Sequence, residues 1–171
     1  MKLFYLLVLT IALSSCSKTS EFSIPTSAYF KISETKSTAF YDTIVVDSIP
    51  TNFSYALQAN QTSTDKVKQM RVQEIDLRII NNAYNQNFNF IDSLKLFLST
   101  GENNKVQVAK YVATATASYA TTLQISSDTT ISGLINNDFF NLTVVAHCRD
   151  SVPVDIQVQT NVLFYVKAKT D

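Results

Sequence analysis

The stretch VDIQVQTNVLFYVKA, residues 154–168, decides the fold class of this chain. Its apolar positions share one parity and are Val154, Ile156, Val158, Val162, Phe164, Val166 and Ala168. The polar positions of the opposite parity are Asp155, Gln157, Gln159, Asn161 and Lys167. Such alternation, rich in β-branched residues, is typical of a strand with one buried face and one solvated face. The stretch therefore predicts a long strand that covers a core.

Shorter stretches with the same alternation come before it. The strands expected from them are 40–47, 53–57, 72–80, 94–98, 106–112, 121–126 and 140–148. Short helices are expected at 65–70 and 131–135. Strands with one apolar face each can bury those faces between two antiparallel sheets. The sequence thus predicts an all-β, two-sheet antiparallel sandwich with Ig-like or Greek-key connectivity and one or two short helices. A closed barrel is the alternative.

The first fifteen residues are typical of a secretory signal. Lys2 supplies a positive start, residues 3–13 form an apolar run, and Ser14 and Ser15 are small residues before a cleavage point. The run is too short for a bilayer core, which needs about 20 apolar residues. We expect a signal helix over residues 1–15 that is cleaved from the mature protein.

Leu13, Ser14, Ser15 and Cys16 complete this signal. An aliphatic residue, two small residues and a cysteine resemble the lipobox of bacterial lipoproteins. The resemblance implies that a peptidase recognises Leu13, Ser14 and Ser15, that it cuts before Cys16, and that the Cys16 thiol carries lipid. Two or more acyl chains anchor a protein stably. The membrane is then a partner, and the expected location is the cell envelope, at the outer membrane and facing the periplasm.

The rest of the chain divides into a tether and one domain. Residues 16–25 are polar apart from two apolar side chains and include Pro25, so we expect a tether there. Residues 26–171 are expected to form a single β-sandwich domain. Cys148 would be the only thiol left beside the lipidated Cys16, so we expect no internal disulfide and a buried, unreactive Cys148.

Residues 72–168 resemble a known family in the order of their elements. A strand ends at Asn81-Asn82, hydrophobic strands follow at 94–98 and 106–109, and a short strand, a helix and two long strands complete the order. This order looks like the late-embryogenesis-abundant group 2 sandwich, also called the water-stress and hypersensitive-response domain, although its Asn-Pro-Asn motif is absent. The resemblance implies a β-sandwich. The chain also resembles the small lipoproteins of the Bacteroidota.

Five triplets resemble the O-glycosylation acceptor of the Bacteroidota, in which Asp precedes Ser or Thr and then an apolar residue or Thr. The acceptors would be Thr43, Ser48, Ser93, Thr129 and Ser151. Asp-Ser and Asp-Thr pairs also form turns and caps at strand ends. Both interpretations therefore stay open at these positions.

The composition excludes several kinds of chemistry. The chain has only two glycines, whereas phosphate-binding loops and dinucleotide fingerprints need several at fixed spacing. It has one histidine and two cysteines, too few for a metal site built from His and Cys once Cys16 is lipidated. Fourteen basic residues face fourteen acidic ones, so no excess of positive charge favours nucleic acid. We expect no metal, no cofactor and no nucleic-acid partner.

His147 and Cys148 are adjacent, so their side chains point to opposite faces of a strand. Cys148 has the parity of Val144 and Ala146 and is expected in the core, while His147 is expected to face outward. The two side chains are therefore not expected to form a thiolate–imidazole pair. A hydrolase that uses His147 is the catalytic alternative that remains, but no motif places a serine beside it.

The sequence accordingly predicts a membrane-anchored cell-envelope lipoprotein that is a non-catalytic binding or structural module. The polar segment 81–87 is the candidate ligand loop, in which Asn82, Tyr84 and Asn85 could hydrogen-bond to a glycan or a peptide and stack on it. The alternative is an accessory subunit of an envelope or secretion complex. Such a subunit would pair with other envelope proteins through a sheet edge, for which residues 113–120 are the candidate.

Overall fold

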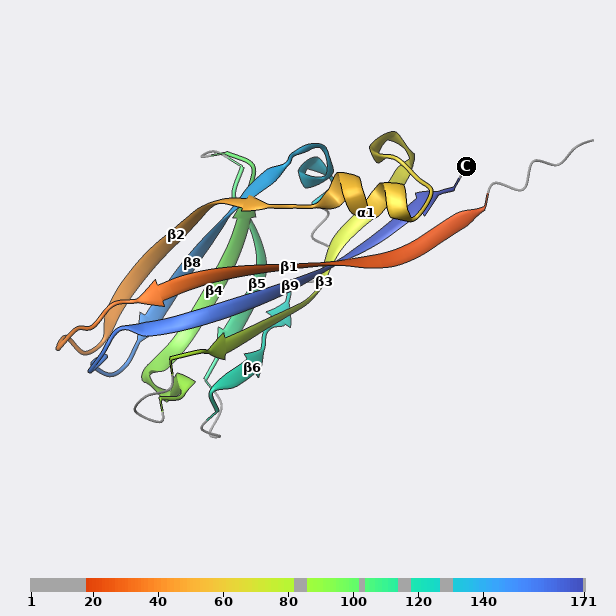
Figure 1. Cartoon of the computed structure of the whole chain (residues 1–171). Coiled ribbons are helices and arrows are strands. Elements are labelled where there is room, and N and C mark those ends of the chain that lie inside the picture. Colours follow the sequence, from red (N-terminus) through yellow and green to blue (C-terminus); the bar gives the residue numbers. More distant parts are fainter. Residues whose placement is uncertain (1–17, 82–85, 102–103, 114–117, 127–130, 171) are drawn as a thin grey trace, which may run out of the picture.

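The computed structural model of the protein describes residues 18–81, 86–101, 104–113, 118–126 and 131–170. These residues form two antiparallel sheets that face each other (Figure 1). One sheet has four strands in the order β1-β9-β3-β6, and the other has five in the order β2-β8-β4-β5-β7. The all-β, two-sheet antiparallel sandwich is confirmed, and the closed barrel is wrong.

The four-stranded sheet contains β1 (Thr19–Ile32), β9 (Ile156–Lys169), β3 (Val67–Ile79) and β6 (Ala120–Thr122). The five-stranded sheet contains β2 (Phe40–Pro50), β8 (Phe139–Cys148), β4 (Ile91–Ser99), β5 (Val106–Val112) and β7 (Gln124–Ile125). One α-helix, α1 (Phe53–Ala59), and the short 3₁₀ helices η1 (Thr64–Lys66), η2 (Phe88–Phe90) and η3 (Ser132–Asn136) complete the described elements.

The strand pairs are nested along the chain. β1 pairs with β9, β2 with β8, β3 with β6 and β4 with β5. In sequence order, both strands of each pair therefore lie between the two strands of the pair named before it. Two sheets with this nesting form a jelly roll, which is built from two Greek keys. Of the two connectivities expected, Greek-key is therefore the one that the chain adopts.

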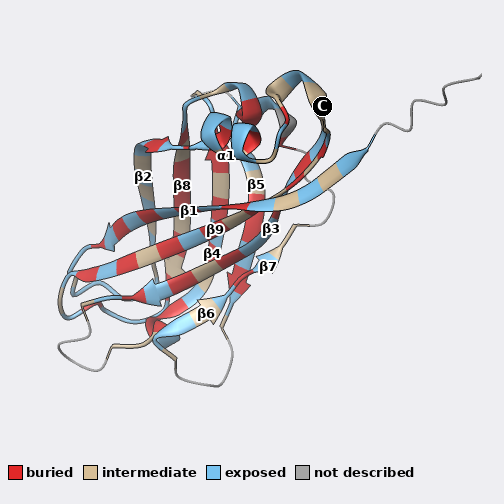
Figure 2. Cartoon of the chain, turned by 45° about the vertical axis from the view of Figure 1, so that its right-hand side comes forward, coloured by how far each residue is buried: buried red, intermediate tan, exposed pale blue. Residues whose placement is uncertain are grey.

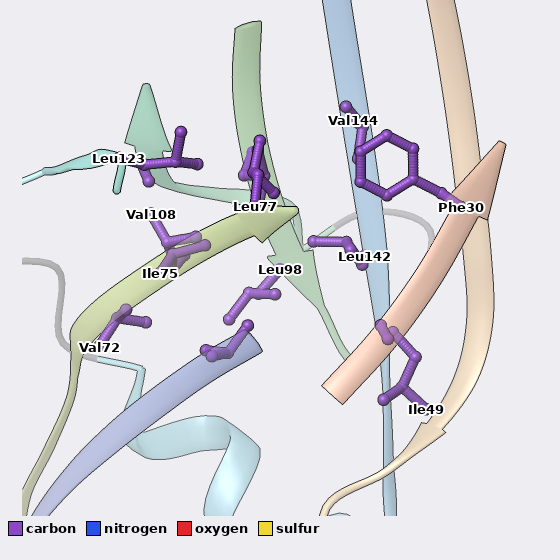
Figure 3. Close-up of a cluster of buried hydrophobic side chains, with 14 of the residues drawn as sticks. Phe30, Ile49, Val72, Ile75, Leu77, Leu98, Val108, Leu123, Leu142 and Val144 are labelled. Atoms are coloured by element: carbon purple, nitrogen blue, oxygen red, sulfur yellow. The ribbon is translucent and has the colours of Figure 1, made fainter. Parts of the chain in front are cut away.

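The core lies between the two sheets and follows the alternation of the strands. Figure 2 shows buried and exposed residues alternating along the strands of both sheets. Apolar side chains from both sheets meet in the interior (Figure 3). Phe164 of β9 makes edge contacts with Phe140 at 5.9 Å and with Phe53 at 5.2 Å between ring centroids. The parity predicted for residues 154–168 is thus the parity that is buried.

The tether expected up to residue 25 is largely a strand. β1 begins at Thr19, and Thr19–Pro25 pairs with β9 in register. Ile24 is buried and Phe22 packs against the core, so this segment contributes to the domain. Pro25 is tolerated because β1 is an edge strand, where a missing N–H can face solvent. The domain therefore begins about seven residues earlier than the expected boundary at residue 26.

The strand expected at 53–57 is wrong, because Phe53–Ala59 is the helix α1. Phe53 and Leu57 are buried while Tyr55 is 78% exposed. This is the i, i+4 pattern of a helix and not the alternation of a strand. A strand and a helix would both place Phe53 and Leu57 on one face. Only the exposed position of Tyr55 therefore distinguishes the helix from the strand.

The strand expected at 121–126 is divided between the two sheets. β6 pairs with β3 in the four-stranded sheet, and β7 pairs with β5 in the five-stranded sheet. Leu123 lies between them and is buried, and its N–H donates to the Ile75 carbonyl at 2.9 Å. The segment therefore crosses from one sheet to the other at Leu123.

β3 begins five residues before the strand expected at 72–80. Bulges between Val67 and Gln69 and between Val72 and Glu74 interrupt its pairing with β9. A bulge inserts one residue, and this insertion shifts the parity of the strand. Met70 and Val72 consequently lie in the same core as Ile75.

The helix expected at 65–70 is largely wrong, because the 3₁₀ turn η1 ends at Lys66 and β3 begins at Val67. The helix expected at 131–135 is the short 3₁₀ turn η3. No helix in the described parts of the chain is long and apolar enough to span a bilayer.

Candidate functional site

Several residues predicted from the sequence lie outside the described residues. They are Leu13, Ser14, Ser15 and Cys16 of the lipobox, Asn82, Tyr84 and Asn85 of the ligand loop, and Thr129. At the start of that loop, Asn81 binds the β9 backbone, because its Oδ1 accepts from the Gln157 N–H at 2.8 Å and its amide donates to the Asp155 carbonyl at 2.7 Å. Asn81 therefore has a structural role.

The other proposed acceptors occupy different surroundings. Thr43, Ser48 and Ser151 are exposed, and Ser93 is half-buried. Ser48 lies at a bulge of β2 with a left-handed φ of 56°, and its N–H donates to Asn141 Oδ1 at 3.0 Å. The exposed three are accessible to a modifying enzyme, and Ser48 also has the turn role that Asp-Ser pairs favour.

A shallow hollow of about 400 Å³ lies on the outer face of the four-stranded sheet. We call it the sheet hollow, and its lining consists of Asp76, Leu77, Arg78, Tyr119, Ala120, Thr121, Thr122 and Asn161. These residues come from β3, from β9 and from the segment that enters β6. β6 has only three residues and pairs with β3 at Asp76, Leu77 and Arg78, so the hollow lies where these two strands meet.

Strand register brings the polar side chains of the sheet hollow together. Asp76 pairs with Asn161 on one side and with Thr122 on the other. The Thr122 hydroxyl donates to Asp76 Oδ1 at 2.5 Å. Asn161 Oδ1 accepts from the Ser27 hydroxyl at 2.8 Å and from Gln159 Nε2 at 3.2 Å. These bonds hold the side chains of Asp76 and Asn161 in fixed orientations.

Aromatic rings lie beside these polar groups. The guanidinium of Arg78 lies 5.5 Å from the ring centroid of Tyr119, within the range of a cation–π interaction. Tyr29 of β1 stands opposite Gln159, which in turn pairs with Arg78. Tyr119 and Tyr29 are 48% and 58% exposed. The surface therefore combines hydrogen-bond donors and acceptors with exposed tyrosine side chains.

A second polar cluster lies on the outer face of the five-stranded sheet. His147 stacks on Tyr41 with 4.5 Å between ring centroids, and its Nδ1 lies 3.3 Å from Asp92 Oδ2. The other oxygen of Asp92 lies 3.5 Å from Arg149 Nη2. The prediction that His147 faces outward and Cys148 faces the core is confirmed.

Register places Ser93 opposite His147, a proximity that no sequence motif indicated. Ser93, His147 and Asp92 are the residue types of a hydrolytic triad, in which the imidazole must hydrogen-bond the serine hydroxyl. In the described part of the chain no hydrogen bond joins the Ser93 hydroxyl to His147. The cluster has the composition of a triad without its geometry.

Cys148 is fully buried between β2 and β4. Burial, with a smaller contribution from the Asp42 charge, raises the pKa of its thiol to about 11. A thiol with a raised pKa carries little thiolate at neutral pH and is a poor nucleophile and metal ligand. Among the described residues, no group of three or more His, Cys, Asp or Glu side chains could hold a metal ion.

The sheet hollow was not predicted from the sequence. In the sequence, Asp76 and Arg78 belong to the solvated face of one expected strand, and Asn161 belongs to the solvated face of another. Their convergence depends on the register between β3, β9 and β6, which joins residues about 40 to 85 positions apart in the chain. No local signal in the sequence marks such a register.

Comparisons with known proteins identify no family. No family model and no curated protein matches the chain. Among solved structures, the 60-mer BFDV capsid protein is similar at a TM-score of 0.45 and 10% identity, over 91% of this chain and 96% of that one. FLHE is similar at 0.31 and 11% identity, over 87% and 97%. A Desmodium yellow mottle tymovirus chain is similar at 0.28 and 10% identity, over 90% and 89%.

These likenesses are too distant to support an argument about function. The assignment of the fold rests on the strand pairing described above. The lipobox, the O-glycosylation acceptors and the resemblance to the water-stress sandwich stay predictions.

Proposed function

We propose that the protein is a non-catalytic binding module of the cell envelope, held at the membrane by lipid on Cys16, and that it binds its ligand in the sheet hollow. The observation that carries the proposal is the convergence of Asp76, Arg78 and Asn161 with the exposed Tyr119 in one hollow. The exposed Tyr29 lies on the neighbouring strand β1, opposite Gln159. A jelly roll by itself implies no function, so the proposal rests on this site and not on the fold.

The lipid anchor is supported by the sequence signal at residues 13–16. An apolar run, two small residues and a cysteine are followed almost at once by a folded domain, since β1 begins at Thr19. The proposed location at the outer membrane, facing the periplasm, rests on this sequence signal. The domain then lies on the surface of the bilayer and is held there by the lipid.

The ligand class proposed is a glycan. Sugar hydroxyls both donate and accept hydrogen bonds, and the sheet hollow offers a carboxylate acceptor, a guanidinium donor and an amide that does both. Tyrosine presents an apolar ring face and a polar hydroxyl, a combination that suits a pyranose ring with its polar rim. The hollow is shallow and open, a shape that admits a segment of a polymer without enclosing it.

Binding can be tested by co-sedimentation of the purified lipidated protein, in detergent, with insoluble peptidoglycan sacculi. A parallel experiment uses soluble envelope polysaccharide as a competitor. Removing a hydrogen bond to a charged group costs about 1.5–3 kcal/mol. We therefore expect Arg78→Ala to weaken binding about tenfold or more. Because Arg78 is exposed, the variant should fold normally.

Lys110→Ala is the matched control, since Lys110 is an exposed cation on the other sheet. It should bind as the unaltered protein does. The proposal of a glycan ligand would be wrong if the unaltered protein bound neither sacculi nor polysaccharide, or if Arg78→Ala and Lys110→Ala weakened binding equally.

The accessory subunit is a second candidate function. β2 and β1 are long edge strands, of 11 and 14 residues, and in the described structure each pairs on one side only. An open strand edge is a template for strand addition by a partner. The edge expected at 113–120 is only partly described, because residues 114–117 lie outside the described ranges. Recovery of the protein alone from solubilised membranes would count against this candidate.

A hydrolase that uses His147 has less support. Its imidazole is engaged by Tyr41 and Asp92 on a sheet face, and the serine that register places beside it makes no hydrogen bond to it.

A further inference from the structure

The start of β1 limits how far the domain can lie from a lipid on Cys16. The strand begins at Thr19, three residues after Cys16. An extended residue spans at most about 3.3–3.6 Å, so Thr19 lies within roughly 11 Å of the lipidated residue. A domain that starts so close cannot turn freely on its anchor. The end of the sandwich that contains Thr19 must therefore lie near the bilayer surface.

Backbone pairing identifies the other segments at this end. Thr19 pairs with Lys169, and the Thr170 N–H donates to the Lys18 carbonyl at 3.0 Å. Val67 pairs with Ala168, and the Thr62 hydroxyl donates to the Lys169 carbonyl at 2.6 Å. Figure 2 shows the start of β1, the end of β9 and α1 at the same end of the molecule. We call residues 18–21, 62–70 and 166–170 the anchor end.

The anchor end is rich in lysine. It contains Lys18, Lys66, Lys68, Lys167 and Lys169, with Glu21 and Asp65 as its carboxylates. Lys167 bonds to Glu21 at 2.6 Å, so this pair is largely neutralised. Lys18, Lys68 and Lys169 are exposed. These exposed positive charges lie at the end of the sandwich from which the anchor emerges.

Exposed aromatic side chains lie beside the anchor end. α1 and the first residue of β8 form part of the same end of the sandwich, because β2 runs into α1 and β8 starts there. Tyr55 is 78% exposed and Phe139 is 55% exposed, and both line one shallow hollow of about 320 Å³. Aromatic residues favour the interface between lipid and water.

We infer that the anchor end docks directly on the bilayer and that its exposed lysines bind the headgroups of anionic phospholipids. The inference rests on the proposed lipidation of Cys16. Lysines near an anionic surface each strengthen binding by about fivefold. Docking in this way makes the strands stand on the membrane. Asn161 is then eight residues from Lys169 along β9, about 26 Å, so the sheet hollow is held at up to that distance from the bilayer surface.

The test is amine acylation of the full lipidated protein on vesicles, with each lysine read out by mass spectrometry. One set of vesicles contains phosphatidylcholine and phosphatidylglycerol, and the other contains phosphatidylcholine alone, so neither has a lipid amine that consumes the reagent. We expect labelling of Lys18, Lys68 and Lys169 to fall at least fivefold on the anionic vesicles compared with the neutral ones. Lys36 and Lys110, exposed and away from the anchor end, serve as internal controls and should be labelled equally on both.

A second measurement uses the absence of tryptophan from the chain. Tyr55→Trp and Tyr29→Trp each introduce a single indole at an exposed position, the first beside the anchor end and the second on the outer sheet face. Lipids brominated near the headgroup should quench the indole fluorescence of Tyr55→Trp and leave that of Tyr29→Trp unchanged. Reversing Lys18, Lys68 and Lys169 to Glu should abolish this quenching, and reversing Lys36, Lys95 and Lys110 should not.

Failure of the lipid anchor and failure of the docking give different results. If the unaltered protein does not stay with phosphatidylcholine vesicles, the lipid anchor itself is wrong and the docking inference falls with it. If the protein stays with both kinds of vesicle but the three lysines are labelled equally on both, the anchor stands and docking by the anchor end is overturned.

Discussion

Cys148 shows how one residue depends on its surroundings. It has the residue type of a nucleophile or a metal ligand, yet it is fully buried in the core and its thiol pKa is raised to about 11. The cause is burial first and the Asp42 carboxylate second, both of which disfavour the thiolate. The thiol therefore behaves as a small apolar side chain that fills the core.

This raised pKa predicts a loss of stability at high pH. Between about pH 9, where an unfolded cysteine ionises, and pH 11, the native state keeps a proton that the unfolded state loses. The free energy of unfolding should therefore fall as pH rises, by about 1 kcal/mol at pH 10 and by roughly 2 to 3 kcal/mol above pH 11.

Urea denaturation of the unaltered protein and of Cys148→Ala at pH 8 and at pH 10 measures this contribution. The alanine variant lacks the thiol, so its stability should fall less over that range. An equal fall in both proteins would show that Cys148 does not contribute.

At the scale of the element, α1 shows where a local pattern is ambiguous. Phe53, Tyr55 and Leu57 fit strand alternation, but the chain forms a helix after Asn52, which adopts a left-handed φ of 54°. The helix lets Phe53 reach Phe164 in the core while Tyr55 stays in solvent. Contact with the core outweighs weak local propensity here, as is usual for short helices.

Truncation of the two aromatic residues of α1 should therefore have very different effects. Phe53→Ala removes a side chain that is 1% exposed, and we expect a loss of about 3–5 kcal/mol of unfolding free energy. Tyr55→Ala, two residues away, should change stability by no more than about 0.5 kcal/mol. Chemical denaturation followed by circular dichroism compares them. Similar losses for both would support the strand over the helix.

At the scale of the whole molecule, the nested pairing makes β9 and β8 interior strands of their sheets, each between two long partners. β9 pairs with β1 over all fourteen of its residues and with β3 over most of them. β6 and β7 have three and two residues and lie at sheet edges. Stability should therefore differ between these parts of one fold.

Native-state hydrogen exchange measured by mass spectrometry tests this difference. The amides of β8 and β9 should exchange slowest, through global unfolding, and those of β6 and β7 fastest, through local opening. The edge strand β1 should exchange faster than its neighbour β9. Exchange from β6 as slow as that from β9 would contradict this account of the sheet.

Part of the fold could be predicted from the amino-acid sequence. Val106–Val112 is a strand with the expected bounds, and the parity of residues 156–168 is the buried parity. Both depend on which side chains face water, which a period of two reveals. The start of β3 at Val67 was missed because two bulges change that period. All of β1 was missed, and its inward positions include the polar Ser20 and Thr26, which weaken the alternation.

The candidate site was harder to predict than the fold. The anchor signal at Leu13–Cys16 is local and can be recognised from four residues. The sheet hollow and the proximity of Ser93 to His147 arise from pairing between distant strands. The choice of partner for a strand depends on the packing of the whole core, so no short stretch contains it.

The sequence by itself determined that the chain is an all-β sandwich, that one parity of residues 154–168 is buried, and that Cys148 faces the core while His147 faces outward. These properties follow from the separation of apolar and polar side chains along each strand, which is local. Only the tertiary structure decided the nested jelly-roll pairing, the helix at Phe53 and the start of the domain at Thr19. Hydrogen bonds and core contacts between distant segments decide these features, and they exist only once both sheets are assembled.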